Sequence, residues 1–114
     1  MTVTIGIPKG STPGESRVAL VPSIIGKYAA LGVELLVEQN AGAAAAFPDE
    51  LYEGVTFCDS LAELSQKAQI MLSVQPPNLE EITLLHPGQI VVGYMYPRRN
   101  PEYALSMRDH RITT

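Results

Sequence analysis

Short apolar runs separated by turn residues recur along this chain and predict a set of buried strands. Each run is bounded by glycine, proline, asparagine or charged residues, which is typical of strands in the middle of a sheet. The predicted strands are Val3–Ile7, Val33–Glu38, Val55–Cys58, Ile70–Val74 and Ile90–Tyr94. Arg111–Thr114 has the same character and is expected to open a further strand that is never finished.

Helix signals lie between these runs. Pro22 suits the first turn of a helix, and Gly32 suits the position just after its end. Capping boxes are predicted at Ser60 with Glu63 and at Asn78 with Glu81, and Asn100 before Pro101 is a further N-cap signal. The predicted helices are Pro22–Leu31, Pro48–Glu53, Ser60–Lys67, Asn78–Leu85 and Asn100–Asp109.

Strands that alternate with helices predict an α/β fold. We expect right-handed βαβ units on an open, mostly parallel sheet with helices on both faces, which is a Rossmann-like or flavodoxin-like arrangement. The 114 residues are enough for one small domain and not for two, so residues 1–114 are expected to form a single α/β domain. The unfinished last strand indicates that this sheet is truncated.

Composition and net charge argue against several classes of function. The net charge of −4 argues against a nucleic-acid partner, which requires a basic face. The longest apolar runs fall well short of the roughly 18–20 residues that span a bilayer, so we expect no direct insertion into a membrane. Cys58 is the one cysteine, which excludes an internal disulfide and a cysteine-rich metal site.

Polar side chains follow the ends of several predicted strands. In a parallel sheet these ends share one edge, where ligands usually bind. The candidates at this edge are Arg17, Gln75, Tyr96, Arg98 and Arg99. An arginine there can hold a carboxylate or a phosphate through two hydrogen bonds. For Arg17 the structural alternative is a cap on a helix end or an ion pair with Glu15.

The two histidines and the cysteine are each expected to have a structural role. His86 lies in a helix-to-strand turn and is expected at the surface, and His110 lies at a helix C-terminus, where a cation is favourable. Neither has a partner at metal-ligand spacing, and Cys58 is expected to be a small buried residue. No G-x-G-x-x-G sequence occurs, so the residues alone indicate a small α/β domain with a candidate anion-binding edge.

Three segments together resemble the start of the alanine dehydrogenase and pyridine nucleotide transhydrogenase family. They are Ile5–Lys9, Glu15–Pro22 and Leu31–Gly42, in the order and spacing typical of that family. The resemblance extends over essentially the whole chain. It implies that the chain is the N-terminal subdomain of a larger NAD(H)-binding domain.

The two branches of the family differ at the edge turns. The resemblance implies that alanine dehydrogenases have a catalytic lysine where this chain has Gln75 and a catalytic histidine where it has Tyr96. Glutamine does not titrate, and a tyrosine hydroxyl is a poor acid or base near neutral pH. The run Tyr96–Glu102 instead resembles the alpha subunit of the proton-translocating NAD(P) transhydrogenases. No residue is assigned a catalytic role, and Arg17, Gln75 and Tyr96 are candidates for lining the cleft.

The transhydrogenase resemblance implies partners and cofactors beyond this chain. The whole enzyme transfers hydride between NADH and NADP⁺ and couples this to proton translocation, with the rest of the alpha subunit and a membrane-bound, NADP-binding beta subunit as partners. The implied location is the cytoplasmic side, peripheral to the inner membrane. The family's NAD-binding glycine loop follows beyond Thr114, so we expect no tightly bound NAD(H) in these 114 residues alone.

Two other interpretations stay open at this point. One is a diverged amino-acid dehydrogenase, and the other is a non-enzymatic binding or assembly module that has kept only the scaffold. We also expect a homodimer, because a truncated sheet leaves an apolar face and a strand edge uncovered.

Overall fold

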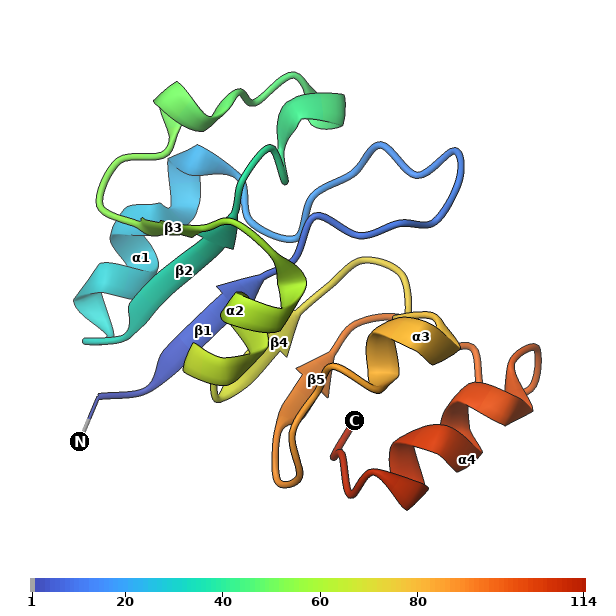
Figure 1. Cartoon of the computed structure of the whole chain (residues 1–114). Coiled ribbons are helices and arrows are strands. Elements are labelled where there is room, and N and C mark those ends of the chain that lie inside the picture. Colours follow the sequence, from blue (N-terminus) through green and yellow to red (C-terminus); the bar gives the residue numbers. More distant parts are fainter. Residues whose placement is uncertain (1) are drawn as a thin grey trace.

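Five parallel strands form the centre of the computed structural model, which describes residues 2–114 (Figure 1). Their order in the sheet is β3-β2-β1-β4-β5. The strands are β1 (Thr4–Ile7), β2 (Glu34–Glu38), β3 (Thr56–Cys58), β4 (Ile70–Leu72) and β5 (Ile90–Val92). The predicted α/β fold with a parallel sheet is confirmed.

Within residues 2–114, four α-helices and three short 3₁₀ helices lie between the strands and after the last of them. The α-helices are α1 (Ile25–Ala30), α2 (Leu61–Lys67), α3 (Leu79–Ile82) and α4 (Pro101–Asp109). The 3₁₀ helices are η1 (Pro22–Ile24), η2 (Ala43–Ala45) and η3 (Asp49–Leu51). Helices lie on both faces of the sheet, as predicted (Figure 1). Parallel sheets usually have both faces covered in this way.

Several predicted elements are longer than those observed. The segment Pro48–Glu53 forms only the 3₁₀ turn η3, and the first predicted helix begins as η1 before it becomes α1. The helix expected to reach Leu85 ends at Ile82, because the following amides bond three residues back and the Thr83 hydroxyl donates to the Glu80 carbonyl. The strand ladder stops at Leu72 in β4 and at Val92 in β5, and β3 omits the predicted Val55.

The capping predictions are partly correct. The box formed by Asn78 and Glu81 is complete. The Ser60 side chain accepts from the Glu63 amide, but the Glu63 carboxylate accepts from the amide of Asp59 instead of that of Ser60. At the start of α4, the Asn100 side chain makes no capping hydrogen bond. The proline that begins α4 and Glu102 in its first turn are the remaining local signals that favour this helix start.

Neighbouring residues of each strand point to opposite layers. In β2, Leu36 faces the layer that contains α2, α3 and α4, while Leu35 and Val37 face the layer that contains α1. In β1, the same alternation places Gly6 beneath α2, where a Cβ would lie 2.8 Å from the Cβ of Ala68. Helix α2 can therefore approach the central strand only because residue 6 has no side chain.

The outer strand β5 is covered on one face only. Val91 is buried under α3 and α4, whereas Ile90 and Val92 are 39% and 50% exposed on the other face. The last residues lie beside β5, where Thr113 forms a parallel bridge with Ile90. The predicted unfinished strand is thus present as a single bridge, and it partly closes the edge that was expected to be open.

Substitution of Gly6 tests the close packing of α2 on β1. We expect Gly6→Ala to lower the free energy of unfolding by about 1–3 kcal/mol, because the added methyl group collides with Ala68. Gly26→Ala is the matched control, since Gly26 lies within α1 with open space around its Cβ position, and it should raise stability by up to about 1 kcal/mol. Urea unfolding of the two variants measures both effects, and equal stability would contradict the packing argument.

Candidate functional site

A crevice is expected where the chain changes direction across the sheet, between β1 and β4. From β1 the chain proceeds outward to β2 and β3, and it then returns to add β4 and β5 on the other side. The loops that follow β1 and β4 therefore leave two neighbouring strands in opposite directions. Open α/β sheets bind ligands in the crevice between two such loops. The first loop contains Lys9–Arg17, and the second contains Ser73–Asn78.

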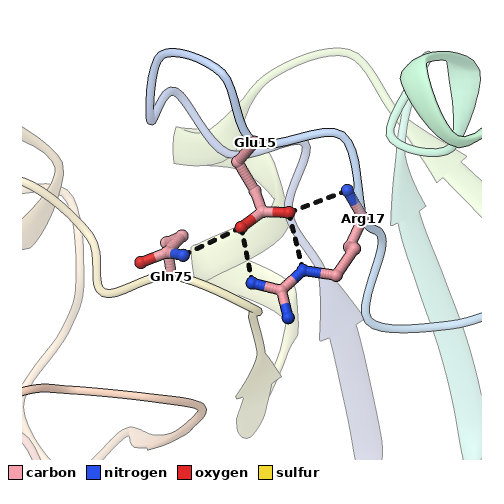
Figure 2. Close-up of polar contacts among 3 residues, drawn as sticks. All are labelled: Glu15, Arg17 and Gln75. Carbon is pink, nitrogen blue, oxygen red and sulfur yellow. Dashed lines mark hydrogen bonds and ion pairs between the residues drawn. The ribbon is translucent and has the colours of Figure 1, made fainter.

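The carboxylate of Glu15 joins these two loops (Figure 2). Arg17 donates from Nε to Oε2 at 2.9 Å and from Nη2 to Oε1 at 2.8 Å, and its backbone amide also donates to Oε2 at 2.9 Å. From the other loop, Gln75 Nε2 donates to Oε1 at 2.8 Å. Four hydrogen bonds thus converge on one carboxylate whose side chain is only 15% exposed.

The electrostatics of this cluster favour its ionised form. Hydrogen bonds from the Arg17 side chain, and then from Gln75, hold the pKa of Glu15 well below its usual range. The hydrogen bond to Glu15 in turn raises the pKa of Arg17 above its already high value. The pair has no net charge, and neither member exchanges a proton near neutral pH.

A second set of hydrogen bonds ties the first loop to the start of α3. Ser11 Oγ donates to Glu81 Oε1 at 3.0 Å, and Asn78 Nδ2 donates to Ser11 Oγ at 3.2 Å. Asn78 and Glu81 are also the capping box of α3. The residues that begin the helix therefore also hold the loop that follows β1.

Beneath the two loops lies a small cavity of about 70 Å³. Its floor is apolar and includes Met71, Leu85 and Val91, while Glu15, Arg17 and Gln75 line its polar side. A volume of this size holds a few water molecules at most.

The structure brings together most of the predicted site residues. Arg17 and Gln75 meet at Glu15, so the predicted ion pair of Arg17 with Glu15 is present. Gln75 also lines a second hollow, of about 290 Å³, together with Tyr96 and Arg99. Arg98 is exposed and lines neither the cavity nor this hollow.

Tyr96 is held in an uncommon backbone conformation. Its φ of 48° lies in the left-handed region, which non-glycine residues occupy rarely and often near functional sites. Its ring stacks on that of Tyr94 with centroids 6.0 Å apart, and the Arg99 guanidinium lies 5.1 Å from its centroid. This cation–π contact and the stacking fix the ring in the turn that follows β5.

Sequence reasoning missed three residues of this region: Glu15 as the centre of the network, Ser73 and Tyr94. The sequence indicated Glu15 only as an ion-pair partner of Arg17. The Ser73 hydroxyl is buried and has no hydrogen-bond partner among the described residues. The sequence could have indicated Tyr94, because every second residue of the predicted strand Ile90–Tyr94 lies on the same face. This rule places Tyr94 beside Ile90 and Val92.

The remaining candidates have structural roles. Cys58 is buried, and burial raises the pKa of its thiol. His86 is exposed, and the His110 ring lies 2.8 Å from the carbonyl oxygen of Ser106 at the end of α4. Within residues 2–114 there is no group of three or more potential metal-ligating side chains. Over the same range, every helix is too short or too polar to cross a bilayer.

The lowered pKa of Glu15 predicts a pH-dependent contribution to stability. Glu15→Gln should be less stable to urea than the parent chain near neutral pH, because the carboxylate stabilises the fold above the ordinary carboxyl pKa. This contribution is lost as the pH falls through the lowered folded-state pKa, so the difference between the two proteins should shrink below about pH 4. Glu53→Gln, at an exposed position, is the control. A difference that does not change with pH would contradict the network.

Comparison with known proteins places this geometry in a family. A family model described as alanine dehydrogenase/PNT, N-terminal domain, matches residues 6–114. NAD(P) transhydrogenase subunit alpha of Cereibacter sphaeroides is 35% identical over 100 residues, covering 86% of this chain and 19% of the relative. Alanine dehydrogenase of Bacillus subtilis (strain 168) is 31% identical over 111 residues, covering 96% of this chain and 29% of the relative.

A solved structure agrees with these relatives. The crystal structure of transhydrogenase from Sinorhizobium meliloti superimposes with a TM-score of 0.89 at 31% identity, covering 96% of this chain and 33% of the other. The chain thus spans between 19% and 33% of the length of these three relatives. Because the family model covers nearly the whole chain and the observed sheet superimposes on a solved member, the chain belongs to the alanine dehydrogenase/PNT N-terminal domain family.

Proposed function

We propose that this chain is the N-terminal portion of the NAD(H)-binding component of a transhydrogenase. Such an enzyme transfers hydride between NADH and NADP⁺ and couples the transfer to proton translocation. The observation that carries this proposal is the lack of a titrating group in the cluster of Glu15, Arg17 and Gln75. The Glu15 carboxylate stays ionised, the Arg17 guanidinium stays protonated, and Gln75 is neutral at every pH.

The two branches of the family need different chemistry at this edge. Interconversion of an amino acid and an oxo acid requires groups that donate and accept protons, in addition to hydride transfer. Hydride transfer between two nicotinamide rings needs no proton from the protein, because the cofactors supply the chemistry and the protein positions them. A cluster that does not exchange protons near neutral pH suits the second reaction.

The cluster also suits a role in positioning. Glu15 already binds the Nε and Nη2 edge of the Arg17 guanidinium, so this edge is not open to an incoming carboxylate. The same hydrogen bonds join the loops after β1 and β4 and set the shape of the crevice. On this proposal Arg17 and Gln75 face the nicotinamide cleft, with Tyr96 beside them.

The proposal includes partners beyond this chain. NAD(H) is bound in the longer protein, where a glycine loop supplies the helix N-terminus for the pyrophosphate. The partners are the remainder of the alpha subunit and a membrane-bound beta subunit that binds NADP. The location is then the cytoplasmic side, peripheral to the inner membrane through the complex.

Hydride-transfer kinetics test the proposal in a transhydrogenase whose N-terminal domain is this sequence. Arg17→Ala and Gln75→Ala should each lower the rate about tenfold or more, because small errors in position are costly in hydride transfer. Thermal unfolding should change little. Arg108→Ala is the control, since Arg108 also forms an exposed ion pair, but on α4.

The competing dehydrogenase interpretation gives a different result in the same protein. It predicts NADH formation that depends on added alanine, whereas our proposal predicts none. We also expect Gln75→Lys to leave alanine oxidation absent, because Tyr96 still occupies the position of the histidine. If Arg17→Ala and Gln75→Ala both keep the wild-type rate of hydride transfer, the two residues are part of the scaffold only.

We further propose that the 114-residue chain forms a symmetric homodimer through the uncovered face of β5. Ile90 and Val92 are exposed there, and apolar surface of this kind favours association. Light scattering at tens of micromolar protein should give the mass of two chains, and Ile90→Lys with Val92→Lys should give that of one. Leu31→Lys, at a 75% exposed position after α1, should remain dimeric. A single-chain mass for the parent would refute the dimer.

A further inference from the structure

The loop that follows β1 is held by hydrogen bonds and very little by packing. Residues 9–16 are exposed, except for the half-buried Glu15. Gly10 and Gly14 have φ values of 77° and 81°, and apart from their chain neighbours no atom lies within 4 Å of either Cβ position. Beneath the loop, the cavity of about 70 Å³ separates it from the apolar side chains of the cavity floor. The hydrogen bonds of this loop therefore decide where it lies.

Ser11 makes the attachment in the middle of this loop. At one end, the Lys9 amide donates to a carboxylate at the end of β2. At the other end, Glu15 accepts from the turn after β4. Between these ends, the Ser11 hydroxyl bonds to both residues of the α3 capping box, and within residues 2–114 these are the hydrogen bonds that join the middle of the loop to another element. Loss of this hydroxyl would therefore release residues 10–14.

The turn after β4 carries an attachment to this loop at each of its ends. Gln75, at the start of the turn, donates to Glu15 (Figure 2), and Asn78, at its end, donates to Ser11. The two residues between them are both prolines. A proline ring fixes its own φ and restricts the residue before it, so this turn is stiff. A shift at one of the two attachments is thus transmitted to the other.

The loop and the turn together form a closed frame with two attachments. When one attachment is lost, the other must order the released segment alone, and it opens more easily because of the entropy that this segment regains. Glu15 is the corner of the frame that holds Nε and Nη2 of Arg17. The orientation of the guanidinium group therefore depends on the attachment at Ser11 as well as on the one at Gln75.

We propose that Ser11 is a positioning residue for the cluster of Glu15, Arg17 and Gln75. Its hydroxyl group joins the loop after β1 to the capping box of α3. This second attachment fixes the Glu15 carboxylate and, through it, the plane of the Arg17 guanidinium. The consequence for hydride transfer rests on the proposed function, whereas the effect on Arg17 does not. The other two members of the attachment also cap α3, so Ser11 is the residue at which positioning can be separated from helix stability.

Hydrogen exchange of the Arg17 Nε proton in the 114-residue chain measures this effect. The proton is bound to Glu15 Oε2, and its exchange with water, followed by nuclear magnetic resonance, requires this hydrogen bond to open. We expect Ser11→Ala to raise the exchange rate about threefold or more, because one hydrogen-bonded attachment of the frame is lost. Ser11→Thr keeps the hydroxyl group and should exchange at the rate of the parent chain. Ser16→Ala is the matched control, since this exposed serine lies in the same loop and outside the frame.

A double substitution tests whether Ser11 acts through Glu15. Glu15→Gln removes the carboxylate from the cluster and should by itself speed the exchange of the Arg17 proton. In this background Ser11→Ala should cause no further increase, because the attachment has no carboxylate left to position. The amide protons of α3 should exchange in Ser11→Ala as they do in the parent chain, since the capping box of Asn78 and Glu81 remains.

The kinetic consequence is measured in a transhydrogenase whose N-terminal domain is this sequence. Ser11→Ala should lower kcat about threefold, which is less than the effect of Arg17→Ala, and it should leave KM for NADH unchanged. The reason is that the substitution displaces the cluster without removing a contact to the cofactor. Ser11→Thr should restore kcat, and Ser16→Ala should keep the parent value.

Four results would overturn the proposal. Three concern exchange of the Arg17 proton: an unchanged rate in Ser11→Ala, an equal increase in Ser11→Thr, and a further increase from Ser11→Ala in the Glu15→Gln background. The fourth is faster exchange throughout α3 in Ser11→Ala, which would make Ser11 part of the helix cap only.

The kinetic measurements separate this proposal from the proposed function. A parent kcat in Ser11→Ala, when Arg17→Ala is slow, would refute the positioning role of Ser11 and leave the proposed function in place. Faster exchange of the Arg17 proton in Ser11→Ala, with normal hydride transfer in Arg17→Ala, would refute the proposed role of the cluster and still confirm that Ser11 positions Arg17.

Discussion

The pairing of β1 with both β2 and β4 is the constraint on which the rest of this structure depends. It makes β1 the central strand and places the reversal of strand order beside it. Helix α2 can cover this centre only because Gly6 leaves room for Ala68. Once these contacts form, the loops after β1 and β4 must leave from adjacent strands at the same edge.

The cluster around Glu15 is a consequence of that arrangement. Glu15 and Arg17 are two residues apart, so their ion pair forms within one loop. The hydrogen bond from Gln75 crosses sixty positions of sequence and joins the two loops. An exposed ion pair alone contributes little to stability. A carboxylate that accepts four hydrogen bonds is more firmly positioned, and for this reason the cluster acts as a fixed element of the crevice.

The same cluster borders two hollows of the domain. Its Glu15 side faces the small cavity and presents no group that exchanges protons near neutral pH. Its other side leaves guanidinium donors at the edge of a larger, apolar hollow, beside the exposed ring of Tyr94. One arginine, held by an internal carboxylate, thus contributes to two neighbouring surfaces of the domain.

Local signals in the sequence determined the type and order of most elements. Apolar runs between turn residues gave all five strands, and Gly32 ended α1 with a φ of 75°, as its position predicted. Local signals also gave the complete capping box of α3, since the bonds in such a box are made within a few residues. They overestimated lengths at Leu85 and at Tyr94, because the end of an element depends on neighbours that the local pattern does not contain. Positions after the predicted strands gave Arg17, Gln75 and Tyr96 among the edge candidates, and resemblance to the family then narrowed the set to these three.

Only the tertiary structure decided which side chains meet. It made Glu15 the centre of the site and turned a row of apolar residues on β5 into an exposed face. It also left the Ser73 hydroxyl buried without a partner among the described residues. These outcomes depend on contacts between residues far apart in the chain, and on which strand face a helix covers. The sequence pattern states that a residue is apolar or polar, whereas its burial is fixed by the three-dimensional packing of its neighbours.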